Sequence, residues 1–562
     1  MLWIAIYILA ISFACFIIYK SKPRHIPGVP HMETTEWFFG DLRPIIKNYV
    51  RTRKFHDYYE LIAANFPGGF YQFHWLAWNT AVVICDPMII EDIMKKDSIF
   101  RRSDDLLKAF GPITPWGSLA LPTNAVWKNH RRFFGPIMNQ NNLKLLTPNI
   151  VQTTENLFNL WESKREALGD AVQRISEEGC FEVMQDLSFL TGDIISDIAF
   201  GFGYHQLEAN IAVVERKGKM GRNRFPIETN ALGRASRMYF EAIPVESTFP
   251  SVSHFFYRLR SAKFRQAERL MEDSLNKKII EGRRKVRLGE TKESCLLEMV
   301  LEKEWDIERE NGKSANLRIE EIRDEMSTLL LAGDDTTSST MGWALRFLTR
   351  NPDVQRRLHA EIKHVLPDVR EHTLTYEDIH STSLPYFDAV IQEILRVSQT
   401  VMTTLRTSTV ETVVNGCVMP KGTTFLLMMG MAGCATKSST LPRLEAEKGT
   451  VPRRFRWEDK VDVDEFRPER WLKADGSFDI NAGPSIPFGT GLRACYGSRL
   501  AQLELRSFIM TLSRRYFLDI LPASLADPNG EKFAEAVTRR PTEMWIRPRP
   551  WAELVDPTTE ES

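Results

Sequence analysis

The sequence predicts a mainly α-helical protein with a minor β component, built as one large unit behind an apolar N-terminal segment. Apolar residues recur at helical spacing in many stretches, whereas candidate strands are few and short. Of the 562 residues, 43% are hydrophobic and 26% are charged, which is typical of a globular chain with a large core and excludes general disorder. No low-complexity linker or repeat divides the chain between about residues 35 and 545, so we expect one body.

The N-terminal segment has the properties of a membrane anchor. Residues 2–19 carry no charge, and as a helix they would span about 27 Å, close to the hydrocarbon thickness of a bilayer. A buried core helix is the alternative, but it would need polar positions on one face. Lys20, Lys22 and Arg24 follow the apolar run, an order opposite to that of a cleaved signal peptide, and they predict a cytosolic C-terminal side. We therefore expect a single-pass anchor at 2–19 and a basic, proline-rich linker at 20–34.

Helical spacing predicts the main elements of the body in order. The expected helices cover residues 100–107, 151–168, 187–200, 264–284, 319–349, 352–365, 387–399 and 500–516. The expected strands cover residues 80–84 and 423–428. Two hydrophilic stretches, residues 281–314 and 437–460, are predicted to be surface connections.

The overall charge and the cysteines exclude several classes of protein. Lys and Arg number 73 and Asp and Glu number 73, so the formal net charge is 0 and we expect no nucleic-acid partner. The 7 cysteines are scattered without a CxxC pair, which indicates neither a disulfide framework nor a zinc ribbon. We expect a reducing environment, in which at most one or two thiols have a function.

One cysteine, Cys495, lies in the most informative segment of the chain. The segment Pro487–Gly497 places glycines around it, and glycine allows a tight loop to approach a flat ligand. A helical pattern begins at Ser498, and the positive end of a helix favours a thiolate over a thiol. A thiolate held in this way is a good axial ligand for haem iron. A buried apolar thiol is the alternative, and it suits the other cysteines.

The same segment resembles the FxxGxRxCxG haem loop of the cytochrome P450 family, the haem-thiolate monooxygenases. Besides Cys495, it matches at Phe488, Gly491, Arg493 and Gly497. The resemblance implies a cytochrome P450-type haem domain that holds haem b. It also implies that Cys495 is the proximal iron ligand, that Phe488 packs beside the sulfur and that Arg493 binds a haem propionate.

Two further motifs match the family, and they occur in the family's order along the chain. Glu393 and Arg396 form its ExxR element, and residues three apart share a helix face and can pair. Residues 466–471 resemble its PERF segment, in which Arg470 would complete a network of one carboxylate and two guanidinium groups. Such a network holds a loop in place even where its net stabilisation is small.

Upstream, residues 332–337 match the family's AGxDTT stretch, which lies in the long helix across the distal haem face. The resemblance implies that Gly333 lets oxygen and substrate approach the backbone. A hydroxyl beside a carboxylate, Thr336 with Asp335, would form a catalytic proton relay, because protons must arrive before the O–O bond breaks. The alternative is a helix N-cap cluster, since Asp and Thr favour caps.

Three more residues are assigned to haem contacts by resemblance. Trp127 and Arg131 fit the family's WxxxR element and lie one helical turn apart, so both can reach one propionate. Arg406 occupies the place of a further propionate ligand. In this family a basic patch docks an acidic flavoprotein reductase. The corresponding residues here are Lys128, His130, Arg131 and Arg132.

The family resemblance implies a microsomal-type monooxygenase with a catalytic domain at residues 35–551 and a tail at 552–562. Nothing after Trp551 suggests a flavin domain, so electrons would come from NADPH through a separate reductase. We expect O2 and a lipophilic substrate, such as a terpenoid, polyketide or alkaloid intermediate, and a location in the endoplasmic reticulum membrane with the catalytic domain in the cytosol.

Alternative functions differ in substrate or in reaction. Fatty-acid or xenobiotic hydroxylation keeps the same chemistry. A reductase-independent haem-thiolate isomerase or dehydratase, or a non-catalytic haem sensor, would not need the relay at Asp335 and Thr336.

The expected distal pocket draws on residues 106–121, 329–336 and 400–405. Its apolar members would be Phe110, Ile113, Trp116, Leu330, Met402 and Leu405, with Thr403 and Thr404 as hydrogen-bonding groups. A basic insertion at residues 436–459 departs from the family pattern and is expected to elaborate the surface.

Overall fold

The computed structural model describes residue 12 and most of residues 25–554. The residues outside this description are 1–11, 13–24, 34, 53, 55, 64, 67, 77–78, 170–176, 221–222, 244–249, 292–294, 312–316, 368–372, 381, 435–451, 456, 458–462, 464, 528–531, 536 and 555–562. Most of the predicted anchor and of the predicted insertion therefore lies outside the described residues. Within the described part, no helix has the length and apolar character needed to cross a bilayer.

Helices dominate the described chain, as the sequence predicts. The helices are α2 (Leu42–Thr52), α3 (Asp57–Ala63), α4 (Pro87–Lys95), α5 (Asp104–Phe110), α6 (Ala125–Phe134), α7 (Gln140–Leu168), α8 (Met184–Phe200), α9 (Gln206–Lys217), α10 (Ala231–Glu241), α11 (Pro250–Arg260), α12 (Ala262–Leu288), α13 (Leu296–Asn311), α14 (Ile319–Arg350), α15 (Pro352–Val365), α16 (Tyr376–His380), α17 (Pro385–Ser398), α18 (Met429–Cys434) and α20 (Ser498–Arg515). The strands are β1 (Phe70–Leu76), β2 (Asn79–Ile84), β3 (Phe100–Arg102), β4 (Phe181–Glu182), β5 (Thr404–Ser408), β6 (Thr412–Val414), β7 (Cys417–Met419), β8 (Thr424–Leu427), β9 (Tyr516–Leu518), β10 (Phe533–Glu535), β11 (Arg539–Pro541), β12 (Trp545–Ile546) and β13 (Pro548–Pro550).

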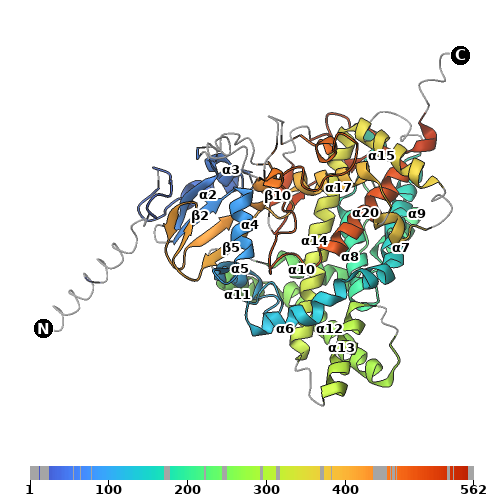
Figure 1. Cartoon of the computed structure of the whole chain (residues 1–562). Coiled ribbons are helices and arrows are strands. Elements are labelled where there is room, and N and C mark those ends of the chain that lie inside the picture. The colour runs from blue at the N-terminus through green and yellow to red at the C-terminus, as the bar shows by residue number, and fades with distance from the viewer. Residues whose placement is uncertain are drawn as a thin grey trace.

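The main sheet lies at one end of the molecule and the large helices at the other (Figure 1). Its strand order is β1-β2-β8-β5-β3, and the predicted strands β2 and β8 are its parallel central pair. Side chains alternate between the two faces of a strand. Val82 and Phe425 therefore enter the apolar cluster on one face, while Val83 and Leu426 enter the cluster on the other. Burial on both faces explains why these segments are continuous apolar runs in the sequence.

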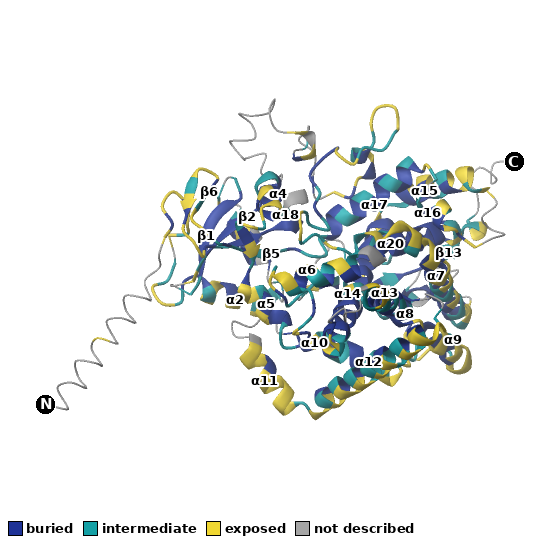
Figure 2. Ribbon diagram, turned by 60° about the horizontal axis from the view of Figure 1, so that its bottom comes forward, coloured by how far each residue is buried: buried dark blue, intermediate teal, exposed yellow. Residues whose placement is uncertain are grey.

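The helical part is organised around α14, which runs through the centre of the molecule and packs along α8 (Figure 2). Both helices are almost entirely buried, because apolar residues surround them rather than forming one stripe. Two glycines of α14 allow the close approach. A Cβ on Gly342 would lie 2.6 Å from Met184 Sδ, and one on Gly333 would lie 2.7 Å from Ile195 Cγ1.

Two of the elements predicted from the sequence are wrong. Residues 100–107 were expected to form one helix, but Phe100–Arg102 is strand β3, because Phe100 pairs with Ser408 of β5. Ser103 then caps α5 by accepting from the Asp105 N–H. The hydrophilic residues 281–314 were expected to be a surface connection, yet they contain the end of α12 and all of α13. Most of their charges are at least partly exposed on amphipathic helices, whereas Glu304 is buried and pairs with Arg283.

Candidate active site

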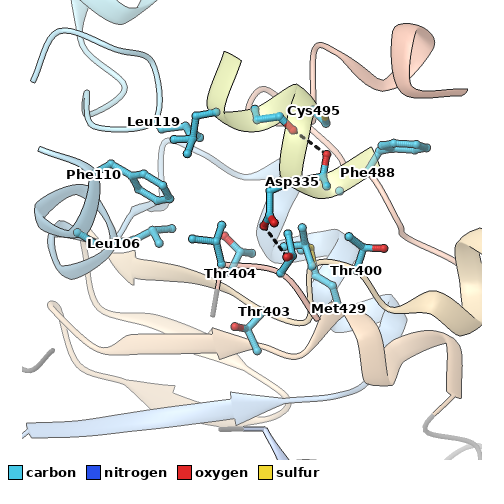
Figure 3. Close-up of a pocket in the computed structure, with 18 of the residues that line it drawn as sticks. Leu106, Phe110, Leu119, Asp335, Thr400, Thr403, Thr404, Met429, Phe488 and Cys495 are labelled. Carbon is cyan, nitrogen blue, oxygen red and sulfur yellow. Dashed lines mark hydrogen bonds between the residues drawn. The ribbon is translucent and has the colours of Figure 1, made fainter. Parts of the chain in front are cut away.

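A cavity of about 1220 Å³ lies where the sheet end meets the helical end. Its walls come from α5, the middle of α14, the segment before β5, the β10–β11 hairpin and the loop before α20. Figure 3 shows Leu106 and Phe110 on one side, Asp335 in the middle, and Cys495 and Phe488 near the loop before α20. Most of the sequence-predicted site residues line this one space.

The loop that carries Cys495 is held in a tight conformation. The backbone N–H of Cys495 donates to the Phe488 carbonyl at 2.9 Å. Gly491 has a φ of 73°, and a Cβ there would come within 2.3 Å of the Met94 carbonyl oxygen. Only glycine fits this position, because the left-handed conformation and the close approach both exclude a side chain. The loop ends at Gly497, which precedes the first turn of α20.

The Cys495 thiol is exposed to the cavity, although protein surrounds the loop. Burial raises the pKa of the Cys495 thiol, while the Gly497 N–H and the positive charge of Arg131 act to lower it. The thiol therefore lies where a ligand in the cavity can reach it.

Three arginines converge on the cavity beside this loop. Arg493 donates to the carbonyl oxygens of Ser118 and Leu121 at 3.0 and 2.7 Å. Burial, together with the charges of Arg406 and Arg131, lowers the pKa of Arg493 to about 10, against the attraction of Asp97. Arg406 is 2% exposed. The neighbouring Arg102 was not predicted; burial and the charges of Arg493 and Arg406 lower its pKa to about 9.

Trp127 and Arg131 lie at the same wall. The Arg493 guanidinium sits 3.9 Å above the Trp127 ring, and the Arg131 guanidinium lies 5.7 Å from it. Arg131 also approaches the Ala494 carbonyl at 3.4 Å. The four predicted propionate contacts, Trp127, Arg131, Arg406 and Arg493, are therefore brought together.

This charge arrangement fits the haem that the sequence implies. Within the described chain, the Nε atoms of Arg102 and Arg406 are buried and have no hydrogen-bond partner. Buried guanidinium groups need anionic partners. The two propionates of a haem would supply such partners, and Cys495 would supply the sulfur ligand for its iron.

The predicted Glu-Arg-Arg network lies behind the cavity. Glu393 is 0% exposed and accepts from Arg396 at 2.7 and 2.8 Å and from Arg470 at 2.9 Å. Sequence reasoning missed two further donors, the Trp471 indole at 2.8 Å and the Arg467 N–H at 2.9 Å. Burial opposes ionisation of Glu393, but these donors outweigh it and hold the pKa of Glu393 below its usual value.

Asp335 and Thr336 lie in the middle of α14, so the N-cap alternative is wrong. The Thr336 hydroxyl donates to the Ala332 carbonyl at 2.7 Å. Asp335 accepts from Thr538 at 2.5 Å and lies 3.8 Å from Arg540. Both side chains line the cavity, although they bond to different partners.

Two acids beside them, the half-buried Asp334 and the buried Glu504, were not predicted. Burial and the charge of Asp335 raise the pKa of Asp334 to about 6, against the Thr191 hydrogen bond. Burial raises the pKa of Glu504 in α20 to about 8, against a hydrogen bond from Thr337. No local motif marks these groups, because their protonation depends on the packing of α8, α14 and α20.

Gly333 has a packing role in addition to the one expected. A Cβ at this position would meet Ile195 of α8, so the glycine allows α14 and α8 to pack closely. Gly333 still lines the cavity.

The three predicted pocket segments all contribute to the cavity. Some apolar side chains expected there face elsewhere in the described structure: Ile113, Trp116, Leu330 and Met402. Leu330 packs into the main core, and the Trp116 ring lies 3.8 Å from the Arg318 guanidinium. The β10–β11 hairpin, which was not among the predicted pocket segments, adds the polar side chains of Thr538 and Arg540.

The predicted basic patch on α6 is smaller than expected. Lys128 and Arg132 are exposed. His130 is 1% exposed and faces Glu325, with Nδ1 to Oε1 at 3.0 Å. Helical geometry turns it inward, because it lies three residues after the buried Trp127.

Comparisons with known proteins show the family to which the chain belongs. The family model "Cytochrome P450" matches residues 30–434 and 462–546. The interval between them, residues 435–461, coincides with the predicted insertion. The chain is 25% identical to a cytochrome P450 monooxygenase of Pestalotiopsis microspora, covering 95% of this chain and 96% of that protein. It is 23% identical to one of Fusarium sporotrichioides, over 95% and 97% of the two chains, and 27% identical to one of Penicillium crustosum, over 79% of each.

Proposed function

Because the chain belongs to the cytochrome P450 family and is a monooxygenase, we propose that it oxidises a lipophilic organic substrate with electrons from an NADPH-dependent flavoprotein reductase. The observation that carries this proposal is that Cys495 lies on one wall of the cavity and residues 332–336 of α14 lie on another. Membership of the family implies a haem with a cysteine thiolate ligand. When bound, such a haem supplies the activation of O2.

Each group of residues has a distinct task in this proposal. Cys495 would hold the iron through its sulfur. Arg102, Arg406 and Arg493, with Trp127 and Arg131 beside them, would hold the propionates. Asp335 and Thr336 deliver protons from the α14 side of the cavity. The Glu393 network keeps the α17 helix and the Pro468–Trp471 turn in place behind the site.

The proposed substrate is a lipophilic intermediate such as a terpenoid, polyketide or alkaloid precursor. Leu106, Phe110 and Leu119 give one side of the cavity an apolar surface, and binding there removes apolar substrate area from water. The similar monooxygenases of three fungi support this class of reaction. Fatty acids and xenobiotics are the competing substrates.

We also propose that residues 2–19 anchor the protein in the endoplasmic reticulum membrane, with the catalytic body in the cytosol. The support is the uncharged sequence of this segment and the basic residues after it. The exposed Lys128 and Arg132 of α6 offer part of a docking site for an acidic reductase.

Reconstitution of the purified protein with haem, a microsomal NADPH-dependent reductase and candidate lipids tests the reaction. We expect a red-shifted Soret band after reduction under carbon monoxide, and product formation that requires both NADPH and O2. Turnover of an organic peroxide without reductase or NADPH would instead support an isomerase or dehydratase and would contradict the proposal.

A further inference from the structure

The cavity wall contains a buried polar cluster that the haem contacts and the proton relay do not use. His56, directly before α3, places Nδ1 3.0 Å from Glu535 Oε2 and Nε2 3.2 Å from the Thr403 hydroxyl. The backbone N–H of His56 also donates to the same Glu535 oxygen at 2.7 Å. All three side chains line the cavity. We call these residues the His56 cluster.

The cluster is assembled from three distant parts of the chain. His56 precedes α3, Thr403 directly precedes β5, and Glu535 ends β10. His56 is 8% exposed and Glu535 is 5% exposed. Burial opposes ionisation of Glu535, but its hydrogen bonds and its attraction to His56 outweigh this and hold the pKa of Glu535 below its usual value. A buried carboxylate with two donors is a rigid acceptor, so it fixes the orientation of the imidazole.

The orientation of the ring determines what the cluster presents to the cavity. An ionised carboxylate only accepts, so Nδ1 carries the hydrogen that faces Glu535. Nε2 is then directed at Thr403, whose hydroxyl has one donor and two acceptor positions. An oxygen atom of a ligand can therefore join this group as a further hydrogen-bond partner. A carboxylate ligand would instead meet the negative charge of Glu535.

The position of the His56 cluster determines how a bound substrate would be oriented in the cavity. Thr403 lies on the sheet side of the cavity, away from Cys495 (Figure 3). The same hairpin that carries Glu535 carries Thr538, which bonds to Asp335 of the relay. A substrate held at the cluster would thus have one end fixed while another part lies toward the Cys495 side.

We propose that the His56 cluster binds a neutral oxygen function of the lipophilic substrate, a hydroxyl or a carbonyl, and so selects which end of the substrate is oxidised. This inference rests on the proposed function, because it needs a haem at Cys495 and a substrate in the same cavity. It narrows the substrate class to apolar molecules that already carry an oxygen group at a distance from the oxidised carbon.

Probes that anchor themselves on the haem iron test the inference without knowledge of the substrate. Imidazoles with an N-alkyl tail, in a series from hexyl to hexadecyl, bind through the ring nitrogen and shift the Soret band. Each tail length is made with a methyl, a hydroxyl or a carboxylate end. In the wild-type holoenzyme we expect the hydroxyl end to tighten binding by roughly three- to tenfold at a preferred tail length, as one added hydrogen bond would. The carboxylate end should give no such gain.

Two variants separate ligand binding from a purely structural role. His56→Asn keeps a donor near the Nδ1 position but removes Nε2, and Thr403→Val removes the hydroxyl at nearly constant volume. Both should abolish the hydroxyl preference while the methyl-ended probes bind as in the wild type. Thr424→Val, which alters another threonine on the cavity wall, should keep the preference.

The outcomes distinguish this inference from the function on which it rests. A reduced carbon monoxide spectrum without a thiolate signature would refute the proposed function and the inference with it. A normal spectrum with no hydroxyl preference at any tail length would refute the inference alone. A preference that persists in both His56→Asn and Thr403→Val would also refute it and would leave the cluster as a structural clamp.

Discussion

The Thr538 hydroxyl donates a 2.5 Å hydrogen bond to the Asp335 carboxylate and so joins the β10–β11 hairpin to the middle of α14. Arg540 of the same hairpin lies 3.8 Å from Asp335. Thr336, the next residue along the helix, donates instead to the Ala332 carbonyl. In the proposed relay, a proton would therefore pass between Asp335 and Thr336 only through a bridging water or after the Thr336 hydroxyl rotates.

Replacement of Thr336 by alanine tests the proton relay. Thr336→Ala removes the hydroxyl without weakening the intrinsic helix preference of α14. NADPH and O2 should still be consumed, but product per NADPH should fall by roughly tenfold to a thousandfold and hydrogen peroxide should rise. The measurement is product and peroxide formed per NADPH oxidised.

Ser338→Ala is the matched control. Ser338 also donates to the carbonyl four residues earlier, at 2.8 Å, but it lies on the opposite side of α14 and is 0% exposed. Its loss should leave the coupling unchanged. Equal loss of coupling in the two variants would mean that the helix, and not the Thr336 hydroxyl, is responsible.

The role of the cysteine ligand is tested by Cys495→Ser. The hydroxyl cannot replace the thiolate, so the variant should either lose haem or lack the red-shifted Soret band when reduced under carbon monoxide. Cys417→Ser, at a thiol of the sheet end, should retain the wild-type spectrum. A wild-type spectrum for Cys495→Ser would contradict the assignment of the iron ligand.

Glu393→Gln tests the buried ionic network. The change keeps the side-chain shape but leaves the buried cations Arg396 and Arg470 without their anion. Breaking a buried pair in this way costs about 3–5 kcal/mol of unfolding free energy. We expect a lower melting temperature and poorer haem retention. Glu411→Gln, at an exposed position directly before β6, should melt within a degree or so of the wild type; an equal effect of the two changes would contradict the prediction.

Glu504→Gln makes stability depend differently on pH. The raised pKa of about 8 means that Glu504 stays protonated in the folded protein until the pH approaches 8. In the unfolded chain it ionises near pH 4.5. The contribution of Glu504 to the free energy of unfolding is fully present below about pH 4.5 and is lost as the pH rises toward 8. Glutamine does not titrate. The free energy of unfolding of the variant, relative to that of the wild type, should therefore rise by up to about 1.4 kcal/mol per pH unit across this interval.

Unfolding measured at the two ends of that interval checks the sign for Glu504. The difference in melting temperature between Glu504→Gln and the wild type should grow with pH. The same difference for Glu320→Gln, an exposed carboxyl in the first turn of α14, should not. A difference for Glu504→Gln that shrinks with rising pH would show that Glu504 is ionised in the folded protein.

Deletion of residues 2–20 tests the proposed membrane anchor. The truncated protein should pass from the membrane fraction to the carbonate-soluble fraction and should still bind haem, because the segment contributes no predicted haem contact. Weak peripheral association is compatible with this result. A truncated protein that resists carbonate extraction would contradict the single-anchor topology.

The long helices and the motif residues could be predicted from the sequence because their signals are local. The helix predicted at residues 352–365 is α15 with the same bounds, and the one at 319–349 differs from α14 by a single residue. Glycines around Cys495, and a glutamate three residues before an arginine at 393–396, restrict the local chemistry before any tertiary contact forms.

The tertiary structure decided which distant groups meet. Residues Phe100–Arg102 form a strand because they pair with β5. This pairing places Arg102 beside Arg406 and Arg493. Thr538 reached Asp335, and Glu535 reached His56, because the β10–β11 hairpin folds back over the cavity. Periodicity in a sequence reports which face of an element is apolar, but it does not report which element will cover that face. The family chemistry was therefore determined by short local motifs, whereas the polar groups of the cavity and the protonation of its buried acids were determined by packing.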